Sequence, residues 1–135
     1  MIMLKDCQFH HIGYAVKDIE RTAKYYTAAG WQMGNVYTDS IQNTYIAFLT
    51  RDGFPMIELV APIDETSPIC NTIKKVGNST YHVCYSVPDI DAAVAELRAQ
   101  RYMPLFKPVE AVAIDNKKIC YLMHPEVGLI EIVER

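Results

Sequence analysis

Apolar and polar residues alternate in two stretches of the chain that are near copies of each other. The first, HIGYAVKDIE, begins at His11, and the second, HVCYSVPDID, begins at His82. Such alternation is typical of a strand with one buried face. Each copy then passes an aspartate, Asp18 or Asp89, that suits a helix N-cap, and continues with apolar residues at helical spacing. The pattern therefore predicts a strand followed by a helix, twice.

A second pair of copies lies further along each repeat. MIELV is centred on Glu58, and LIEIV is centred on Glu131. The two histidines that open the first pair are 71 positions apart (11 to 82), and the two glutamates are 73 positions apart (58 to 131). Two landmarks that recur with nearly the same period indicate an internal duplication.

The elements between these landmarks follow the same order in both copies. We predict a strand, a helix and three further strands in each, with Gly30 ending the first helix and a hairpin turn at Arg51–Phe54. A short helix between Pro68 and Gly77 is predicted in the connection. The predicted elements are strands at 8–16, 31–37, 43–50 and 56–61 with a helix at 18–29, then strands at 80–87, 105–107, 117–123 and 129–134 with a helix from position 89.

This order predicts an α+β fold built from two tandem βαβββ modules. Module one covers about residues 8–61, a linker about residues 62–79, and module two about residues 80–135. A chain of 135 residues has the size of one compact domain, so we expect a single domain over 1–135.

Charge and composition argue against several classes of protein. The net charge of −3 provides no basic surface for nucleic acid or for an anionic membrane. No apolar run approaches the roughly 18 residues of a membrane span, and Lys5 and Asp6 come before a signal-peptide core could form. We therefore expect a cytoplasmic protein that binds neither nucleic acid nor membrane. The cysteines, which form no CxxC motif and are expected to be free thiols, are Cys7, Cys70, Cys84 and Cys120.

The chemistry-bearing residues of the repeats are the histidine and the glutamate that each copy places in mid-strand. A single such residue among Val, Ile and Leu is most often a hydrogen-bonded core group, because burying it without a partner is costly. Because the duplication repeats both residues, a purely structural role becomes less favoured than metal binding. If the two copies pair their sheets about a pseudo-twofold axis, His11, Glu58, His82 and Glu131 converge, and a divalent metal is the simplest group that satisfies all four.

Two other histidines compete for a ligand role, and we exclude both. His10 lies on the opposite strand face from His11, and the second copy has Tyr81 at its position. His124 stands in a turn before a proline and has no counterpart in the first copy. For contacts to a substrate, we consider Tyr45 and Lys118 as weak candidates, the lysine because it could meet an anionic tail.

The motifs together resemble the vicinal oxygen chelate superfamily over essentially the whole chain. HHIGYAVKDIE is similar to the opening strand and helix of that family, and MIELVAP followed by DETSPI is similar to the segment around its first carboxylate. YHVCYSVPDIDAAVAEL looks like the start of the second module, and KICYLMHPEVGLIEIVE looks like its end. The superfamily includes glyoxalase I (lactoylglutathione lyase), methylmalonyl-CoA epimerase, extradiol dioxygenases and bleomycin-resistance proteins.

The resemblance implies a cup-shaped mixed sheet, made of two βαβββ modules, with a metal inside. His11 and His82 match the histidine ligands of the family, and Glu58 and Glu131 match its carboxylate ligands. It also implies that Glu131, on the last strand, is the catalytic base. Mixed nitrogen and oxygen ligation admits one divalent ion of Ni, Co, Zn, Mn or Fe.

The function implied by the resemblance is that of a metal-dependent lyase or isomerase. It removes a proton next to a carbonyl through a metal-stabilised enediolate, as glyoxalase I or methylmalonyl-CoA epimerase does, on a small carbonyl or thioester substrate. Extradiol dioxygenases use two histidines and one carboxylate, so Glu58 argues against that branch. The alternative is a small-molecule binding or resistance protein of the same fold without catalysis. We also expect a homodimer, because the apolar strands TYIAFL and KICYLM need a cover.

Overall fold

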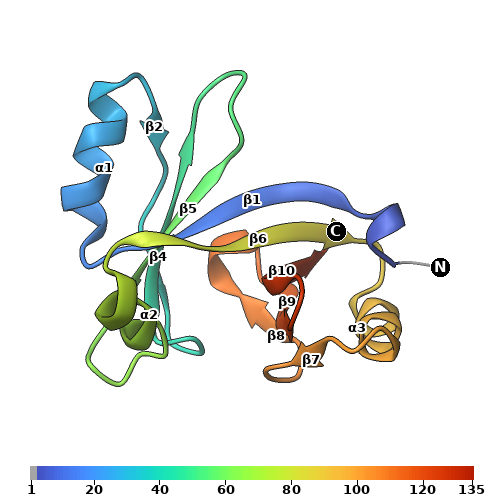
Figure 1. Ribbon diagram of the computed structural model, residues 1–135. Coiled ribbons are helices and arrows are strands. Elements are labelled where there is room, and N and C mark those ends of the chain that lie inside the picture. Colours follow the sequence, from blue (N-terminus) through green and yellow to red (C-terminus); the bar gives the residue numbers. More distant parts are fainter. Residues whose placement is uncertain (1–2) are drawn as a thin grey trace. The chain divides into compact units, whose positions relative to one another are not determined.

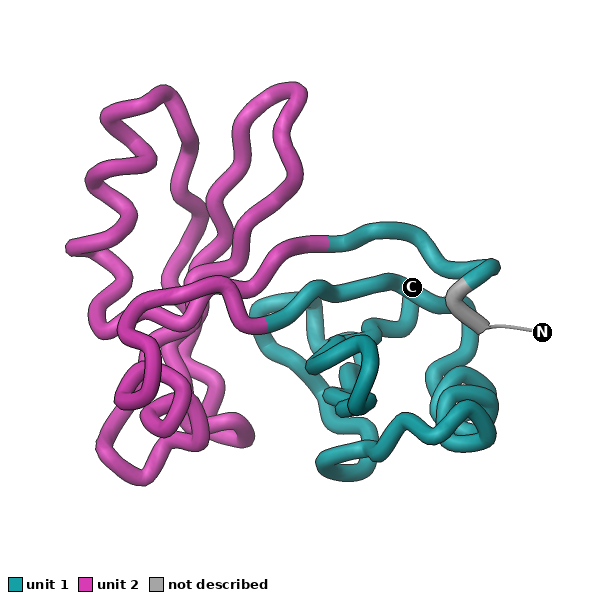
Figure 2. The backbone as a smooth tube through the Cα atoms, in the orientation of Figure 1, with its two compact units in different colours: residues 1–10, 82–135 teal, residues 11–81 magenta. Residues whose placement is uncertain are grey.

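The computed structural model describes residues 3–135 and divides the chain into two compact units. Unit 1 comprises residues 1–10 and 82–135, and unit 2 comprises residues 11–81 (Figure 2). The described residues contain ten strands and three α-helices, which confirms the predicted α+β class and the two-module order. The two longest helices have ten residues each, so no helix in this part of the chain is long and apolar enough to cross a membrane.

Unit 2 contains the first copy of the repeat and the connection that follows it (Figure 1). Its strands are ordered β2-β4-β5-β1, with β3 also paired to β4. The first strand is parallel to β5, and β5 is antiparallel to β4. The elements are β1 (Gln8–Ala15, whose first three residues belong to unit 1), α1 (Ile19–Ala28), β2 (Gln32–Met33), β3 (Tyr37–Asp39), β4 (Thr44–Thr50), β5 (Ile57–Pro62) and α2 (Ile69–Val76).

Unit 1 contains the second copy and repeats this construction. Its strands are ordered β6-β10-β9-β7, with β8 also paired to β9. The strand β6 is parallel to β10, and β10 is antiparallel to β9. The elements are a 3-10 turn (Met3–Asp6), β6 (Ser79–Val87, whose first three residues belong to unit 2), α3 (Ile90–Ala99), β7 (Met103–Pro104), β8 (Val109–Ala111), a second 3-10 turn (Val112–Ile114), β9 (Lys117–His124) and β10 (Gly128–Glu134).

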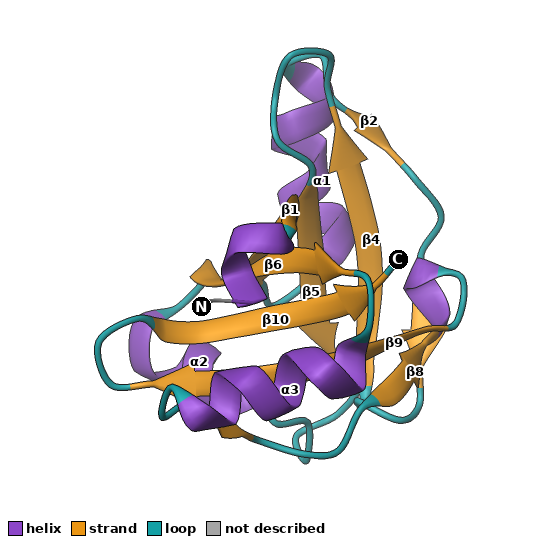
Figure 3. Ribbon diagram, turned by 90° about the vertical axis from the view of Figure 1, so that its right-hand side faces the viewer, coloured by secondary structure: helices purple, strands orange, loops and turns teal. Residues whose placement is uncertain are grey.

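In each unit, the helix that follows the first strand packs against one face of the strands. In unit 2, Ile19 and Ala23 of α1 join a buried cluster with side chains of β4 and β5. In unit 1, α3 lies along β9 and β10 (Figure 3) and buries Ile90, Ala93 and Leu97 in a matching cluster. Because side chains alternate along a strand, the residues between these core positions point to the opposite face of the sheet.

The predicted second strand of each copy is interrupted. The predicted strand 31–37 is present as β2 and β3, which pair with opposite ends of β4 and are separated at Gly34. The predicted strand 105–107 is wrong, because the paired residues lie on either side of it, in β7 and β8. Leu105 N still donates to Tyr121 O at 2.9 Å, whereas Pro108, just before β8, has no amide hydrogen with which to continue the ladder.

The local signals for turns and helix ends are confirmed. Asp18 Oδ1 accepts a hydrogen bond from Arg21 N at 2.9 Å, and Asp89 Oδ1 accepts one from Ala92 N at 3.0 Å. In the hairpin between β4 and β5, Phe54 N donates to Arg51 O at 3.0 Å. Such caps and turns use donors and acceptors that would otherwise lack partners, so their sequence signals depend little on the rest of the fold.

The strands TYIAFL and KICYLM leave little apolar surface for a partner to cover. Among the apolar side chains of these two described strands, Tyr45 and Met123 are exposed, at 38% and 42%, and the others are buried or half-buried. These two strands therefore give the homodimer little support, and it stays a prediction.

We expect Asp89→Ala to lower the free energy of unfolding by about 1 kcal/mol, because the first turn of α3 loses a side-chain acceptor. The control is Asp89→Ser, which keeps an acceptor at the same position and should cost less than about 0.5 kcal/mol. Urea denaturation followed by circular dichroism measures both. Equal losses for the two variants would show that capping is not the role of Asp89.

Candidate functional site

Strand alternation places the repeated histidines on the sheet faces that the helices do not cover. In β1, His11, Gly13 and Ala15 are buried, whereas the residues between them are half-buried. In β6, His82, Cys84 and Ser86 occupy the equivalent buried positions. The face predicted for His11 from the sequence is confirmed.

Unit 2 brings one histidine and one glutamate together. His11 Nε2 lies 3.3 Å from Glu58 Oε1, and the two residues are 0% and 2% exposed. In the pairing of β1 with β5, Gly13 lies opposite Glu58. His11 is two residues before Gly13, so its side chain points to the same face as that of Glu58. On the other side of β5, Phe48 is opposite Glu58, and its ring centroid is 5.5 Å from that of His11 in an edge-on arrangement.

Unit 1 repeats this pair with the same strand register. His82 Nε2 lies 3.1 Å from Glu131 Oε1, and the two residues are 3% and 2% exposed. The pairing of β6 with β10 sets Cys84 opposite Glu131, again two residues after the histidine. Tyr121 of β9 is opposite Glu131, and its ring centroid is 5.1 Å from that of His82. Each unit therefore holds an imidazole, a carboxylate and an aromatic ring in the same arrangement.

The distances within the pairs fit two kinds of chemistry. A protonated imidazole would form an ion pair with the carboxylate, and a neutral imidazole would leave both groups as ligands for a cation. Two ligand atoms that are each about 2.1 Å from an ion, at a right angle to each other, lie about 3.0 Å apart. The separations of 3.1 and 3.3 Å are close to this value, so each pair is suited to contribute two neighbouring ligands.

The weak substrate-contact candidates lie on other faces. Tyr45 is three residues before Phe48 in β4, so the two side chains point to opposite faces of the sheet. Tyr45 therefore lies on the face that α1 covers, where it lines a pocket of about 280 Å³ with Val36 and Ala61. Lys118 is exposed and lies on the same face of β9 as Cys120, which belongs to the α3 cluster. Neither residue lies on the face of its unit that carries the histidine–glutamate pair.

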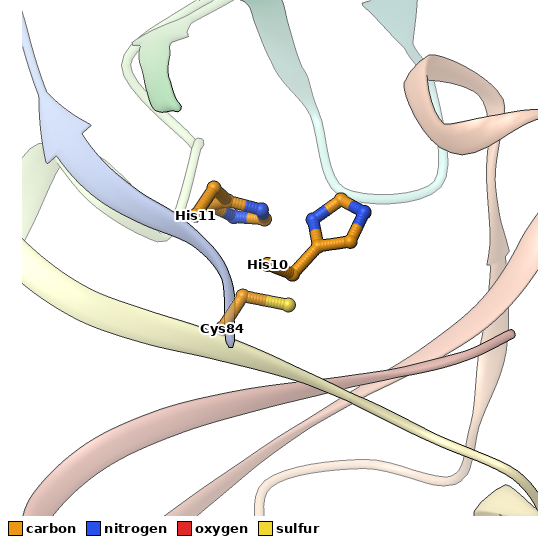
Figure 4. A group of neighbouring side chains, drawn as sticks. All are labelled: His10, His11 and Cys84. Carbon is orange, nitrogen blue, oxygen red and sulfur yellow. The ribbon is translucent and has the colours of Figure 1, made fainter. Parts of the chain in front are cut away.

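The two excluded histidines have other neighbours. One ring nitrogen of His10 lies within 4.8 Å of the sulfur of Cys84, another residue of unit 1, and Figure 4 shows both together with His11, the next residue of β1. His124 Nδ1 accepts a hydrogen bond from Glu126 N at 3.0 Å, and its ring lies 4.6 Å from that of Tyr102. These contacts give His124 a structural role, and the exclusion of His10 stays a prediction.

Three residues beside the pairs were not found from the sequence. Phe48 and Tyr121 are separated by the same 73 positions as the two glutamates, so extending the repeat along β4 and β9 would have found them. Asp39, which is 2% exposed, lies opposite Thr44 on the same face as Phe48. Its carboxylate accepts hydrogen bonds from Gln42 N at 3.0 Å and Gln42 Nε2 at 2.8 Å, so it also caps the turn before β4.

Comparison with protein families gives one match. The model described as the glyoxalase/bleomycin resistance protein/dioxygenase superfamily matches residues 10–121. The ethylmalonyl-CoA/methylmalonyl-CoA epimerase of Cereibacter sphaeroides is 28% identical over 121 residues, which are 88% of this chain and 89% of the relative. The mitochondrial methylmalonyl-CoA epimerase of Homo sapiens is 26% identical over 88% of this chain and 67% of the relative.

Solved structures of methylmalonyl-CoA epimerases are also similar to this chain. The methylmalonyl-CoA epimerase of Mycobacterium tuberculosis matches with a TM-score of 0.82 and 29% identity, over 93% of this chain and 86% of that one. A methylmalonyl-CoA epimerase in complex with methylmalonyl-CoA and NH4+ matches with a TM-score of 0.81 and 26% identity, over 95% and 94% of the two chains. The relatives named here are enzymes, and the fold class predicted from the sequence is confirmed.

Cys70 and Cys120 are free thiols, as predicted, and differ in exposure. Cys120 is buried beside the face that carries Glu131, and its thiol donates to Phe106 O at 3.2 Å. Burial raises the pKa of Cys120 to about 11, and the negative charge of Glu131 adds to the shift. Cys70, in contrast, is half-buried at the start of α2.

We expect Cys120 to resist thiol reagents in the folded protein. At pH 8 a thiol of pKa about 11 is ionised to about one part in a thousand, and the thiolate is the reactive form. Brief treatment with a maleimide, followed by peptide mass spectrometry, should therefore label Cys70 and leave Cys120 unmodified. The same treatment in guanidinium chloride should label both. Equal labelling in the folded protein would contradict the buried environment of Cys120.

Proposed function

Because the chain belongs to the glyoxalase/bleomycin resistance protein/dioxygenase superfamily, we propose that it is an epimerase of a methylmalonyl-CoA-type thioester. The observation that carries the proposal is the histidine–glutamate pair that both units repeat in the same strand register. The names of the relatives support a CoA thioester as the substrate class. The glyoxalase I reading of the sequence stays a prediction that no comparison tests.

The same proposal assigns His11, Glu58, His82 and Glu131 to one divalent metal ion. The support is the distance within each pair, which suits neighbouring ligands, and the burial of both carboxylates, which is costly without a cation nearby. Imidazole and carboxylate ligands suit Ni, Co, Zn, Mn or Fe. When bound, the ion supplies a Lewis acid for the oxygen atoms of the substrate.

Glu131 is our proposed base. Epimerisation at C2 of a substituted malonyl thioester begins with removal of the proton that stands between two carbonyl groups. A carboxylate can accept this proton if it lies within hydrogen-bonding reach. Glu131 belongs to the last strand, where Tyr121 and Cys84 flank it and His82 orients one of its oxygens. A carboxylate held against these neighbours favours a defined path for the proton.

We expect the wild-type protein to bind one divalent ion per chain. His11→Ala and His82→Ala should each lose most of this metal, because either change removes a ligand of the single site. The control is His124→Ala, which changes a histidine outside the pairs and should keep the metal. Elemental analysis after dialysis against Co2+ measures the stoichiometry. Two ions in the wild type, with one kept in each single variant, would show that the pairs bind separately.

We expect Glu131→Gln to lower the rate of hydrogen–deuterium exchange at C2 by at least about a hundredfold, the usual scale for a lost general base. Glutamine keeps an oxygen ligand but cannot accept the proton at neutral pH. Glu58→Gln should keep appreciable exchange, because Glu58 is assigned to metal binding alone. The measurement follows the C2 proton of methylmalonyl-CoA by NMR in D2O, with metal content determined for each variant.

Two outcomes of this experiment would contradict the proposal. If Glu131→Gln exchanges as fast as the wild type, Glu131 is not the base, and Asp39, the buried carboxylate on the same face as Phe48, becomes the next candidate. If the metal-loaded wild type exchanges neither methylmalonyl-CoA nor a hemithioacetal, the binding-protein alternative is favoured over an enzyme.

A further inference from the structure

A pocket of about 390 Å³ lies in unit 2, at the start of α1. We call it the α1 pocket, and define it by Lys17, Arg21, Lys24, Tyr25 and Asn78. The backbone of its rim is held in place by Asn78, whose Oδ1 accepts a hydrogen bond from Lys17 N at 3.0 Å. This contact connects the end of β1 to the residue that precedes β6, so the wall of the pocket is built from two distant parts of the chain.

The charge of the α1 pocket is positive, in contrast to the net charge of the chain. Lys17, Arg21 and Lys24 line it together with one carboxylate, Asp18, whereas the whole chain carries a net charge of −3. Asp18 already accepts a hydrogen bond from the α1 backbone. Within residues 5–135, the three cationic side chains form no ion pair. Three cations against one carboxylate leave the α1 pocket with a positive charge, which attracts an anionic ligand.

The internal repeat shows that these cations are not part of the shared scaffold. Shifting Lys17, Arg21 and Lys24 by the repeat distance of 71 positions leads to Pro88, Ala92 and Ala95. The flanking positions, in contrast, keep their character, since Asp18 corresponds to Asp89 and Ile19 to Ile90. The second copy therefore forms its helix without these charges, so neither the cap nor the core requires them in the first copy.

An aromatic ring accompanies the cations. Tyr25 lines the α1 pocket and is 72% exposed, and Lys24 Nζ lies 5.3 Å from the centre of its ring. An exposed tyrosine beside three cations suits a ligand that combines phosphate groups with a flat base, because the ring can stack on the base while the cations bind the phosphates.

We propose that the α1 pocket binds the phosphorylated adenosine end of a CoA thioester. The inference rests on the proposed function, from which the CoA thioester comes. The α1 pocket begins at Lys17, six residues after His11 on the same stretch of chain, a separation of about 20 Å for extended backbone. An extended pantetheine arm, which connects the thioester to the adenosine phosphates, is of similar length.

The test compares two substrates that differ only in the nucleotide. These are methylmalonyl-CoA and methylmalonyl-pantetheine, and C2 exchange is measured for both with the double variant Arg21→Ala/Lys24→Ala. We expect KM for the CoA thioester to rise at least about tenfold, since two charge-assisted contacts to phosphate are lost. KM for the pantetheine thioester should change by less than about twofold. The control is Arg98→Ala, which removes an exposed cation from α3 and should change neither value.

A binding measurement that does not depend on turnover completes the test. Adenosine 3′,5′-bisphosphate is titrated into wild type, the double variant and Arg98→Ala by calorimetry at two salt concentrations. We expect binding to the wild type that weakens with salt and is at least about tenfold weaker in the double variant. Equal binding to wild type and double variant, or an equal rise of KM for both thioesters, would overturn the inference. Loss of exchange with both substrates in the wild type would overturn the proposed function, while the titration would still report on the α1 pocket.

Discussion

The burial of a carboxylate beside an imidazole is the constraint on which the rest of the site depends. Glu58 and Glu131 are almost completely buried, and an ionised carboxylate in such a place needs a cation or a hydrogen-bond donor close by. In both units a histidine nitrogen lies 3.1 to 3.3 Å from the carboxylate, so a protonated imidazole, or a cation bound by both groups, would meet this need. Because this contact crosses two parallel strands, a shift of one residue in their register would move the glutamate to the helix-covered face.

The face that the helix covers and the face that carries the histidine–glutamate pair belong to the same strands, so packing in the core and the geometry of the pair are linked. In β9, Cys120 packs in the α3 cluster while Tyr121, the next residue, faces Glu131. The negative charge of Glu131, on the other face, also raises the pKa of the Cys120 thiol. Changes in the core behind the pairs are therefore expected to affect the positions of the ligands.

The duplication supplies a histidine–glutamate pair in each unit, and the two copies differ in the residues around it. The histidines and glutamates are identical in the two copies, whereas the aromatic neighbour is phenylalanine in one and tyrosine in the other. The largest difference in charge lies on the helices, where α1 carries cations at positions that are proline or alanine around α3. Residues that keep the histidine–glutamate pair are the same in both copies, whereas the helix surfaces, which the pair does not use, are free to differ.

The sequence by itself determined the repeated elements, their caps and the four ligand candidates. These features depend on local backbone geometry: alternation sets the face of His11, and an aspartate at a helix start accepts the nearest free amides. The tertiary structure alone decided the division of each second strand into two pieces, the burial of Asp39 and the positive charge of the α1 pocket. The physical reason is that strand pairing and pocket walls bring together residues that are far apart in sequence, such as Lys17 and Asn78, and local periodicity carries no information about such pairs.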